Sequence, residues 1–142
     1  MTGGRLATHL ADTSVIMRIH HEDVAARTEP MFISGRLATC AIVDLELLRA
    51  ARDVRVHKEV WVERQLLPRA PVTDACAARA IEVQAELCAR GQHRDIPIND
   101  LLIAAAAEPE GLAVLHYDHS FDLIAAVTGQ PTEWVVPRGT VP

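Results

Sequence analysis

The strongest constraint on the fold is a repeated pattern in which a short apolar segment runs directly into polar residues that can begin a helix. The apolar segments cover residues 6–11, 37–42 and 112–116, and cap-type side chains follow closely after them. The clearest of them, Leu112–His116, passes into Tyr117-Asp118-His119-Ser120. Strands that alternate with helices in this way predict an α/β domain with a mainly parallel central sheet.

The stretches between these strands carry helical periodicity together with start and stop signals. We expect helices over residues 14–26, 44–52, 56–66, 73–90, 99–108 and 121–127, a turn over 31–35, and a final edge strand over 133–136. Residues 69–72 are compatible with a loop or a short strand. The chain has no internal repeat and no Gly/Ser linker, so its 142 residues predict a single domain over 1–142.

Composition narrows the compartment in which the protein works. Three cysteines, Cys40, Cys76 and Cys88, are odd in number and lack CxxC spacing, which indicates a reducing environment. The uncharged run Leu101–Ala107 is far shorter than the roughly 20 residues that cross a bilayer. Met1–Leu10 has no long apolar stretch and no cleavage site of a secretion signal. We therefore expect a cytoplasmic protein that does not insert into a membrane.

The net charge of −5 excludes a general nucleic-acid coat protein, which needs a basic surface. It does not exclude a nuclease, because an acidic centre that gathers metal ions lowers the total charge. Among the fourteen basic residues only Lys58 is a lysine. The others are arginines, the side chain better suited to bidentate contacts with phosphate.

Four acidic residues each follow a strand or open a helix at the same expected end of the sheet: Asp12, Glu46, Asp100 and Asp118. The carboxyl ends of parallel strands form a common crevice, so these side chains are expected to converge. Like charges at short range raise one another's pKa, and a divalent cation is the usual compensation. Oxygen ligands without a cysteine pair or an HExxH motif favour Mg²⁺ or Mn²⁺ over zinc. The chemistry that follows is hydrolysis of a phosphodiester.

Helix capping is the alternative explanation for each of these acids taken singly. Four of them in equivalent places favour a site. Asp44 lies two residues before Glu46 and must face elsewhere on a helix, so we assign Asp44 to capping. Asp122 is interpreted as a helix-start residue, with a secondary acidic contact as the other possibility.

Four segments of the chain together resemble PIN-domain ribonucleases, in particular VapC-type toxins of bacterial toxin–antitoxin pairs. They are Ala11-Asp12-Thr13-Ser14-Val15, Ala41-Ile42-Val43-Asp44-Leu45-Glu46-Leu47, Asn99-Asp100-Leu101-Leu102-Ile103-Ala104-Ala105 and residues 114–125. The family's acidic quartet falls on Asp12, Glu46, Asp100 and Asp118. The family often has a further acidic residue where Ser120 stands here.

This resemblance implies a three-layer α/β/α domain and Mg²⁺-dependent cleavage of RNA, of the transfer RNA (tRNA) or ribosomal RNA (rRNA) class. It also implies inhibition by a cognate VapB-type antitoxin and a homodimer, for which the helix around Val56 and Trp61 is a contact surface. Because Mg²⁺ keeps several waters, we expect direct contacts from Asp12, Asp100 and Asp118, with Glu46 acting through water. The alternative function is a non-catalytic PIN-like module that binds RNA or protein.

Several other polar residues have both a structural and a functional interpretation. Thr13 and Asn99 are secondary site candidates that could equally cap helices. His116 and His119 flank Asp118 and are interpreted as hydrogen-bonded structural residues rather than as a general base.

Two further sets of side chains concern contacts with RNA. Arg90 and Arg94, with His93, form either a basic rim for RNA phosphates or an ordinary solvated helix end. Trp61 and Trp134 are interpreted as core or interface anchors rather than as platforms for stacked bases.

Overall fold

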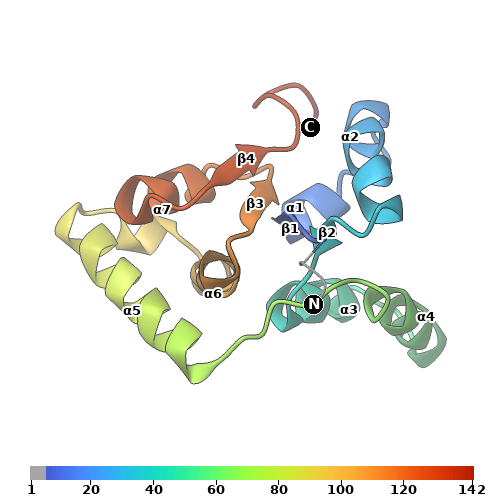
Figure 1. Cartoon of the computed structure of the whole chain (residues 1–142), viewed down its shortest axis with the longest axis horizontal. Coiled ribbons are helices and arrows are strands. Elements are labelled where there is room, and N and C mark those ends of the chain that lie inside the picture. The colour runs from blue at the N-terminus through green and yellow to red at the C-terminus, as the bar shows by residue number, and fades with distance from the viewer. Residues whose placement is uncertain (1–5) are drawn as a thin grey trace.

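The computed structural model describes residues 6–142 and contains a four-stranded sheet in which all neighbouring strands are parallel (Figure 1). The strand order is β2-β1-β3-β4. The strands are β1 (His9–Ala11), β2 (Leu37–Ala38), β3 (Ala113–His116) and β4 (Thr132–Trp134). The predicted parallel sheet and the predicted edge strand are therefore confirmed. The part of the secretion argument that rests on residues 1–5 lies outside the described residues.

Seven α-helices and two short 3₁₀ helices accompany the sheet in the described chain. The α-helices are α1 (Thr13–Ile16), α2 (Glu22–Ile33), α3 (Ala41–Arg49), α4 (Val54–Arg64), α5 (Asp74–Ala89), α6 (Ile98–Ala107) and α7 (Ser120–Thr128). The 3₁₀ helices are η1 (His93–Asp95) and η2 (Glu108–Glu110). None of the helices within residues 6–142 has the length and apolar character needed to cross a membrane.

Helices cover both faces of the sheet, which gives the expected α/β/α layering. Successive strand residues point to opposite faces. Leu10 and Val114 accordingly join a large core with α3, α5, α6 and α7, whereas Ala11 and Leu115 join a smaller core with α1 and α2. The alanine-rich helix α6 is almost entirely buried and packs against α5 and α7. Its small side chains allow this close packing, as the sequence indicated.

The helix expected over residues 14–26 is wrong, because the structure has two helices there. The short helix α1 ends at Ile16, and the extended backbone of His21 begins α2. Two acidic residues in the first turn of α2, Glu22 and Asp23, favour a new start at this point because they complement the positive end of the helix dipole. The predicted turn over 31–35 is therefore the end of α2, although the chain does turn at Gly35, whose φ is 72°.

Two boundaries near the expected site also differ from the sequence prediction. The strand expected over residues 37–42 pairs only over Leu37–Ala38, because Cys40 is already the N-cap of α3. The alanine-rich helix begins at Ile98 after Pro97 rather than at Asn99 or Asp100. Neither of those two side chains caps it.

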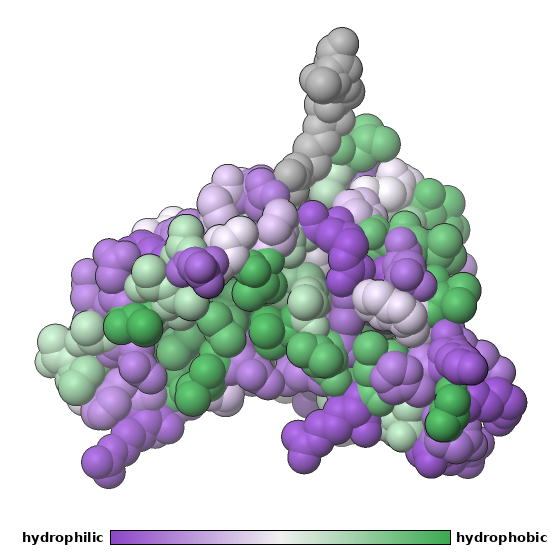
Figure 2. Space-filling model, turned by 90° about the horizontal axis from the view of Figure 1, so that it is seen from below, coloured by the Kyte–Doolittle hydropathy of each residue, from purple (hydrophilic) through white to green (hydrophobic). Residues whose placement is uncertain are grey.

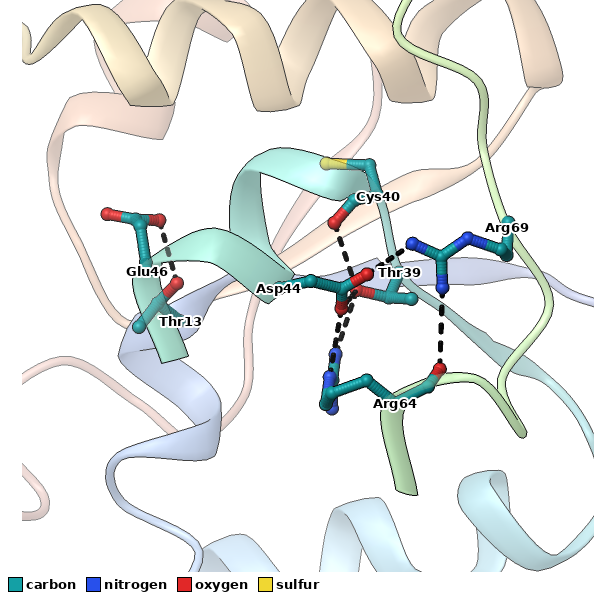
Figure 3. A network of polar contacts seen from close by, with 7 residues as sticks. All are labelled: Thr13, Thr39, Cys40, Asp44, Glu46, Arg64 and Arg69. Carbon is teal, nitrogen blue, oxygen red and sulfur yellow. Dashed lines mark hydrogen bonds and ion pairs between the residues drawn. The ribbon is translucent and has the colours of Figure 1, made fainter. Parts of the chain in front are cut away.

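The assignment of Asp44 to helix capping is wrong, since Asp44 lies inside α3 and forms a buried network with two arginines (Figure 3). Arg64 Nε donates to Asp44 Oδ1 at 3.0 Å, and Arg69 Nη2 bonds Asp44 Oδ2. Thr39 Oγ1 donates to the same Oδ1 at 2.9 Å and accepts from Arg64 Nη2 at 2.8 Å. The network joins the end of the second strand segment, α3, and the end of α4, so it fixes how α3 is rotated against the sheet.

We expect Asp44→Asn to lower the free energy of unfolding by about 3 kcal/mol, because it leaves the guanidinium of Arg64 buried without its counter-charge. Chemical denaturation monitored by circular dichroism measures this value. The control is Glu59→Gln, which breaks the exposed Arg55–Glu59 pair on α4 and should cost less than about 0.5 kcal/mol. Equal effects of the two substitutions would contradict the role given to the Asp44 network.

Candidate active site

Asp12 stands at the carboxyl end of β1, between the sheet and α1. Its backbone N–H donates to the Leu115 carbonyl of β3 at 2.9 Å, so the β1–β3 register fixes its place. It is also the N-cap of α1, because Oδ2 accepts from the N–H and the hydroxyl of Ser14 at 3.0 and 2.6 Å. Capping and site functions are therefore compatible: both bonds go to Oδ2, and Oδ1 accepts no hydrogen bond from the described residues.

Ser14 connects Asp12 with the segment that carries Asp118. The Ser14 hydroxyl donates to Asp12 and accepts from the backbone N–H of Tyr117 at 2.9 Å. The carboxylate of Asp118 in turn accepts from the Ser120 N–H at 2.9 Å. A chain of short hydrogen bonds therefore holds the loop after β3 against the loop after β1.

Glu46 is held by the two secondary candidates that the sequence singled out. Thr13 Oγ1 donates to Glu46 Oε1 at 2.8 Å, as Figure 3 shows, and Asn99 Nδ2 donates to Oε2 at 3.3 Å. Thr13 comes from α1, Glu46 from α3 and Asn99 from α6. Three helices that are distant in sequence thus meet at one carboxylate.

Asp100 lies in the first turn of α6 and is only 7% exposed. Its Oδ2 is buried without a hydrogen-bond partner among the described residues. Burial, followed by repulsion from Asp12, Asp118 and Glu46, raises the pKa of Asp100 to about 7, and the side chain of Ser120 offsets this only in part. The structure therefore brings the four predicted acids into one electrostatic group.

The pKa of Asp12 is raised by the same causes. Burial has the largest effect, the hydrogen bonds from Ser14 oppose it, and repulsion from Glu46 and Asp118 adds to it. Two buried carboxyl groups with raised pKa values beside two further carboxylates are typical of a site that a cation completes.

The residues present fit a divalent metal ion. The donors are carboxylate oxygens, which Mg²⁺ and Mn²⁺ prefer, and the buried Oδ2 of Asp100 lacks any other partner. Within residues 6–142 no three acidic, histidine or cysteine side chains are already drawn together as a metal cage. This is compatible with Mg²⁺, which keeps several waters and takes few protein ligands.

His116 is engaged in ring packing and in a hydrogen bond, which favours its interpretation as a structural residue. It is fully buried between the rings of Phe121 and Trp134, and its Nδ1 accepts from the Asp118 N–H at 3.2 Å. Burial lowers the pKa of His116 to about 4. A neutral ring that accepts at Nδ1 positions the backbone of Asp118, while its Nε2 is buried without a hydrogen-bond partner among the described residues.

Asp122 lies in the first turn of α7, as expected for a helix-start residue. Its carboxylate accepts from Trp134 Nε1 at 3.1 Å and contacts His119 Nδ1 at the same distance. Trp134 also packs against the ring of Tyr117. Trp134 is therefore an anchor between α7 and β4, and Asp122 is engaged in holding it.

The predicted basic rim is exposed, and its contact with RNA stays a prediction. Arg90 is the C-cap of α5, and Arg94 lies in η1. Two features of the site could not be predicted from the sequence. The Asp44 network joins residues 20 and 25 positions apart, and Ser120 lies beside Asp100; no periodic pattern or motif reports such pairings.

Comparison with known proteins agrees with this arrangement. The model of the PIN domain family matches residues 10–127. Ribonuclease VapC51 of Mycobacterium tuberculosis is 46% identical over 134 residues, which cover 94% of this chain and 96% of the relative. Ribonuclease VapC2 of the same species is 53% identical over 131 residues, which cover 91% and 93%.

The fold is also that of a solved toxin–antitoxin structure. In the crystal structure of DNA-bound VapBC from Salmonella typhimurium, one chain superposes with a TM-score of 0.73 at 21% identity, covering 92% of this chain and 99% of that one. At this identity the likeness concerns the fold, whereas the matches to the mycobacterial ribonucleases extend to the sequence. The chain therefore belongs to the PIN-domain family, among the VapC ribonucleases of VapBC toxin–antitoxin systems.

Proposed function

We propose that the protein is a Mg²⁺-dependent endoribonuclease, with Mn²⁺ as a substitute, whose catalytic residues are Asp12, Glu46, Asp100 and Asp118. The observation that carries the proposal is the convergence of these four acids from four separate segments, together with the unpartnered buried oxygen of Asp100. A structural role alone does not account for such a cluster, because the neighbouring charges raise the cost of ionising Asp12 and Asp100.

The metal would be held by Asp12, Asp100 and Asp118, and when bound it supplies charge neutralisation for the scissile phosphate and a more acidic water. The chain's own contribution is positioning. Ser14 holds Asp12 Oδ2 and leaves Oδ1 free to point elsewhere, while the Ser120 N–H holds Asp118. Thr13 and Asn99 hold Glu46, whose carboxylate can orient a water at the edge of the site.

The alternative, a PIN-like module that binds RNA or protein without cutting it, finds no specific support. Such a module has no need for a complete quartet. Replacing the other three acids by neutral residues would relieve the repulsion that raises the pKa of Asp100. All four acids are present, and Asp12, Glu46 and Asp118 lie close enough to Asp100 to raise its pKa. The enzyme is the better account.

For partners, we propose an RNA substrate of the tRNA or rRNA class, a cognate VapB-type antitoxin that covers the acidic cluster with a cationic side chain, and a homodimer. Glu46 and Asp118 are only partly buried, and a group of like charge that a partner can reach is a natural docking point for a basic residue. The side of α3, α4 and α5 shows several hydrophobic areas among polar side chains (Figure 2). On α4 and the turn after it, Val54, Val62 and Leu66 are largely exposed and suit a protein contact.

We expect Asp12→Asn to reduce RNA cleavage by orders of magnitude, because it removes one ligand charge from the metal site. The fold should survive, since Asn caps a helix about as well as Asp. Cleavage of labelled RNA across a Mg²⁺ titration and thermal unfolding of the same sample measure the two effects. Asp23→Asn, an exposed acid on α2, is the matched control. Undiminished cleavage by Asp12→Asn would refute the proposed role.

We expect Asp100→Asn to stabilise the metal-free protein, and increasingly so as the pH rises. The pKa of Asp100 is higher in the folded chain than its ordinary 3.8, so the folded state holds the proton more tightly and loses stability as the pH rises toward about 7. The amide cannot ionise. The variant should therefore gain at least about 1 kcal/mol over wild type at about pH 8 and much less at about pH 4.

Urea unfolding in the presence of a chelator measures this difference. Because both proteins keep His116, its pH-dependent contribution largely cancels when the two curves are subtracted. The difference that remains reports the ionisation of Asp100 together with its coupling to the neighbouring acids. A difference that does not change with pH would contradict the proposed repulsion at Asp100.

Expression of the wild-type chain alone is expected to arrest growth of a bacterial host. Co-expression of its cognate VapB-type antitoxin should restore growth, and Asp12→Asn should be harmless without it. Growth curves with immunoblots for equal protein levels test this. If the folded wild-type chain is harmless while it cleaves RNA in vitro, the toxin function fails and the nuclease function stands.

A further inference from the structure

A cleft of about 320 Å³ opens beside Glu46. Glu46 lines it together with its two donors, Thr13 and Asn99. Arg49 and three apolar side chains, Met17, Ile42 and Leu45, complete the lining. The cleft therefore combines a cation and apolar surface directly next to the proposed catalytic acids.

Arg49 is free to bind a ligand. It follows Glu46 by three positions on α3, which places the two side chains on the same face of the helix. Both oxygens of Glu46 already accept hydrogen bonds, from Thr13 and Asn99. The Arg49 guanidinium is exposed and makes no hydrogen bond, ion pair or ring contact with any residue in the described part of the chain.

The other arginines that line clefts within residues 6–142 are engaged, which sets Arg49 apart. Arg64 and Arg69 bind Asp44, and Arg79 binds Glu108 in a bidentate pair. Engaged guanidinium groups of this kind hold helices together. Arg49 has the same fork of donors and lines its cleft without such a partner in the described part of the chain.

Met17 and Leu45 give the cleft an apolar wall although they are 66% and 63% exposed. Nucleic-acid bases are flat and apolar on their faces, and single-stranded RNA presents them unstacked. A cavity of this size lies at the small end of ligand sites and is suited to one nucleotide rather than to a duplex. Arg49 can therefore contact a phosphate, and Met17 and Leu45 can contact a base, in the same cleft that Glu46 lines.

We propose that this cleft is a subsite for the nucleotide next to the scissile phosphate of a single-stranded RNA segment. Arg49 binds the phosphate of that nucleotide, and Met17 and Leu45 contact its base. The proposal rests on the proposed ribonuclease function. It adds the path of the RNA, which runs across α3 toward Arg49. Arg49 is a substrate-binding residue, distinct from the rim at Arg90 and Arg94.

The test compares Arg49→Gln with Arg52→Gln, which removes an equal charge from an exposed arginine three positions further along, outside the cleft. Both are made in the Asp12→Asn background so that RNA is not cut. Binding of a fluorescently labelled 12-nucleotide single-stranded RNA of mixed sequence is measured by anisotropy at several salt concentrations. Arg49→Gln should weaken binding about three- to tenfold and reduce the salt slope by about 0.7, as expected for the loss of one phosphate contact.

Arg52→Gln should change the affinity for RNA less than twofold, because Arg52 lies outside the cleft and loses no phosphate contact there. A second variant, Leu45→Ser, should weaken binding about two- to fivefold with an unchanged salt slope, because it removes a base contact and no charge. Equal effects of Arg49→Gln and Arg52→Gln would overturn the subsite. Loss of antitoxin binding in Arg49→Gln with RNA binding intact would also overturn it, in favour of a peptide site.

Kinetics of the otherwise wild-type enzyme separate this proposal from the proposed function. Arg49→Gln should raise KM for the 12-nucleotide RNA with little change in kcat, which is the mark of lost uniform binding. A fall in kcat at unchanged KM would contradict a substrate-binding role. If wild type cleaves no RNA in Mg²⁺ while Arg49→Gln still weakens RNA binding, the nuclease function fails and the RNA subsite stands.

Discussion

The parallel register of β1 and β3 is the constraint on which the site depends. Ala11 lies opposite Leu115, and the Asp12 N–H donates to the Leu115 carbonyl, so the segments that leave both strands emerge at one edge. The acids after these strands are brought against Asp100 at the start of α6, where burial and repulsion raise its pKa to about 7. Folding thus assembles a cluster of charge that the chain alone does not neutralise, which is the physical reason for assigning it a cation.

Two buried aspartates show how a structural carboxylate differs from a functional one. Asp44, at 2% exposure, is satisfied by Arg64, Arg69 and Thr39, and its network sets the rotation of α3. That rotation turns Glu46 toward the cluster. Asp100, at 7% exposure, lies among other acids and keeps an oxygen without a partner. The two aspartates are similarly buried, but Asp44 lies among cations and Asp100 lies among acids. Asp44 therefore holds α3 in place, whereas Asp100 is available for a metal.

The sequence predicted the sheet, most helices and the convergence of the quartet because these follow from local periodicity and from the shared edge of parallel strands. It did not predict the break between α1 and α2, where a run of turns at residues 17–21 interrupts a continuous helical pattern. It also assigned Asp44 to a cap, since its ion pairs form across 20 and 25 positions that no local pattern connects. Arg49 was overlooked for the same reason: only the folded cleft places it beside Glu46.

Anomalous diffraction from crystals soaked in Mn²⁺ can show whether the acidic cluster binds a divalent cation. We expect an anomalous peak within coordination distance of carboxylate oxygens of Asp12, Asp100 and Asp118. The Asp100 Oδ2 should be among the ligands, and the peak should be absent from Asp100→Asn crystals. A fully soaked crystal with the cluster open to solvent and no peak there, or a peak that persists at full height in Asp100→Asn, would contradict this metal site.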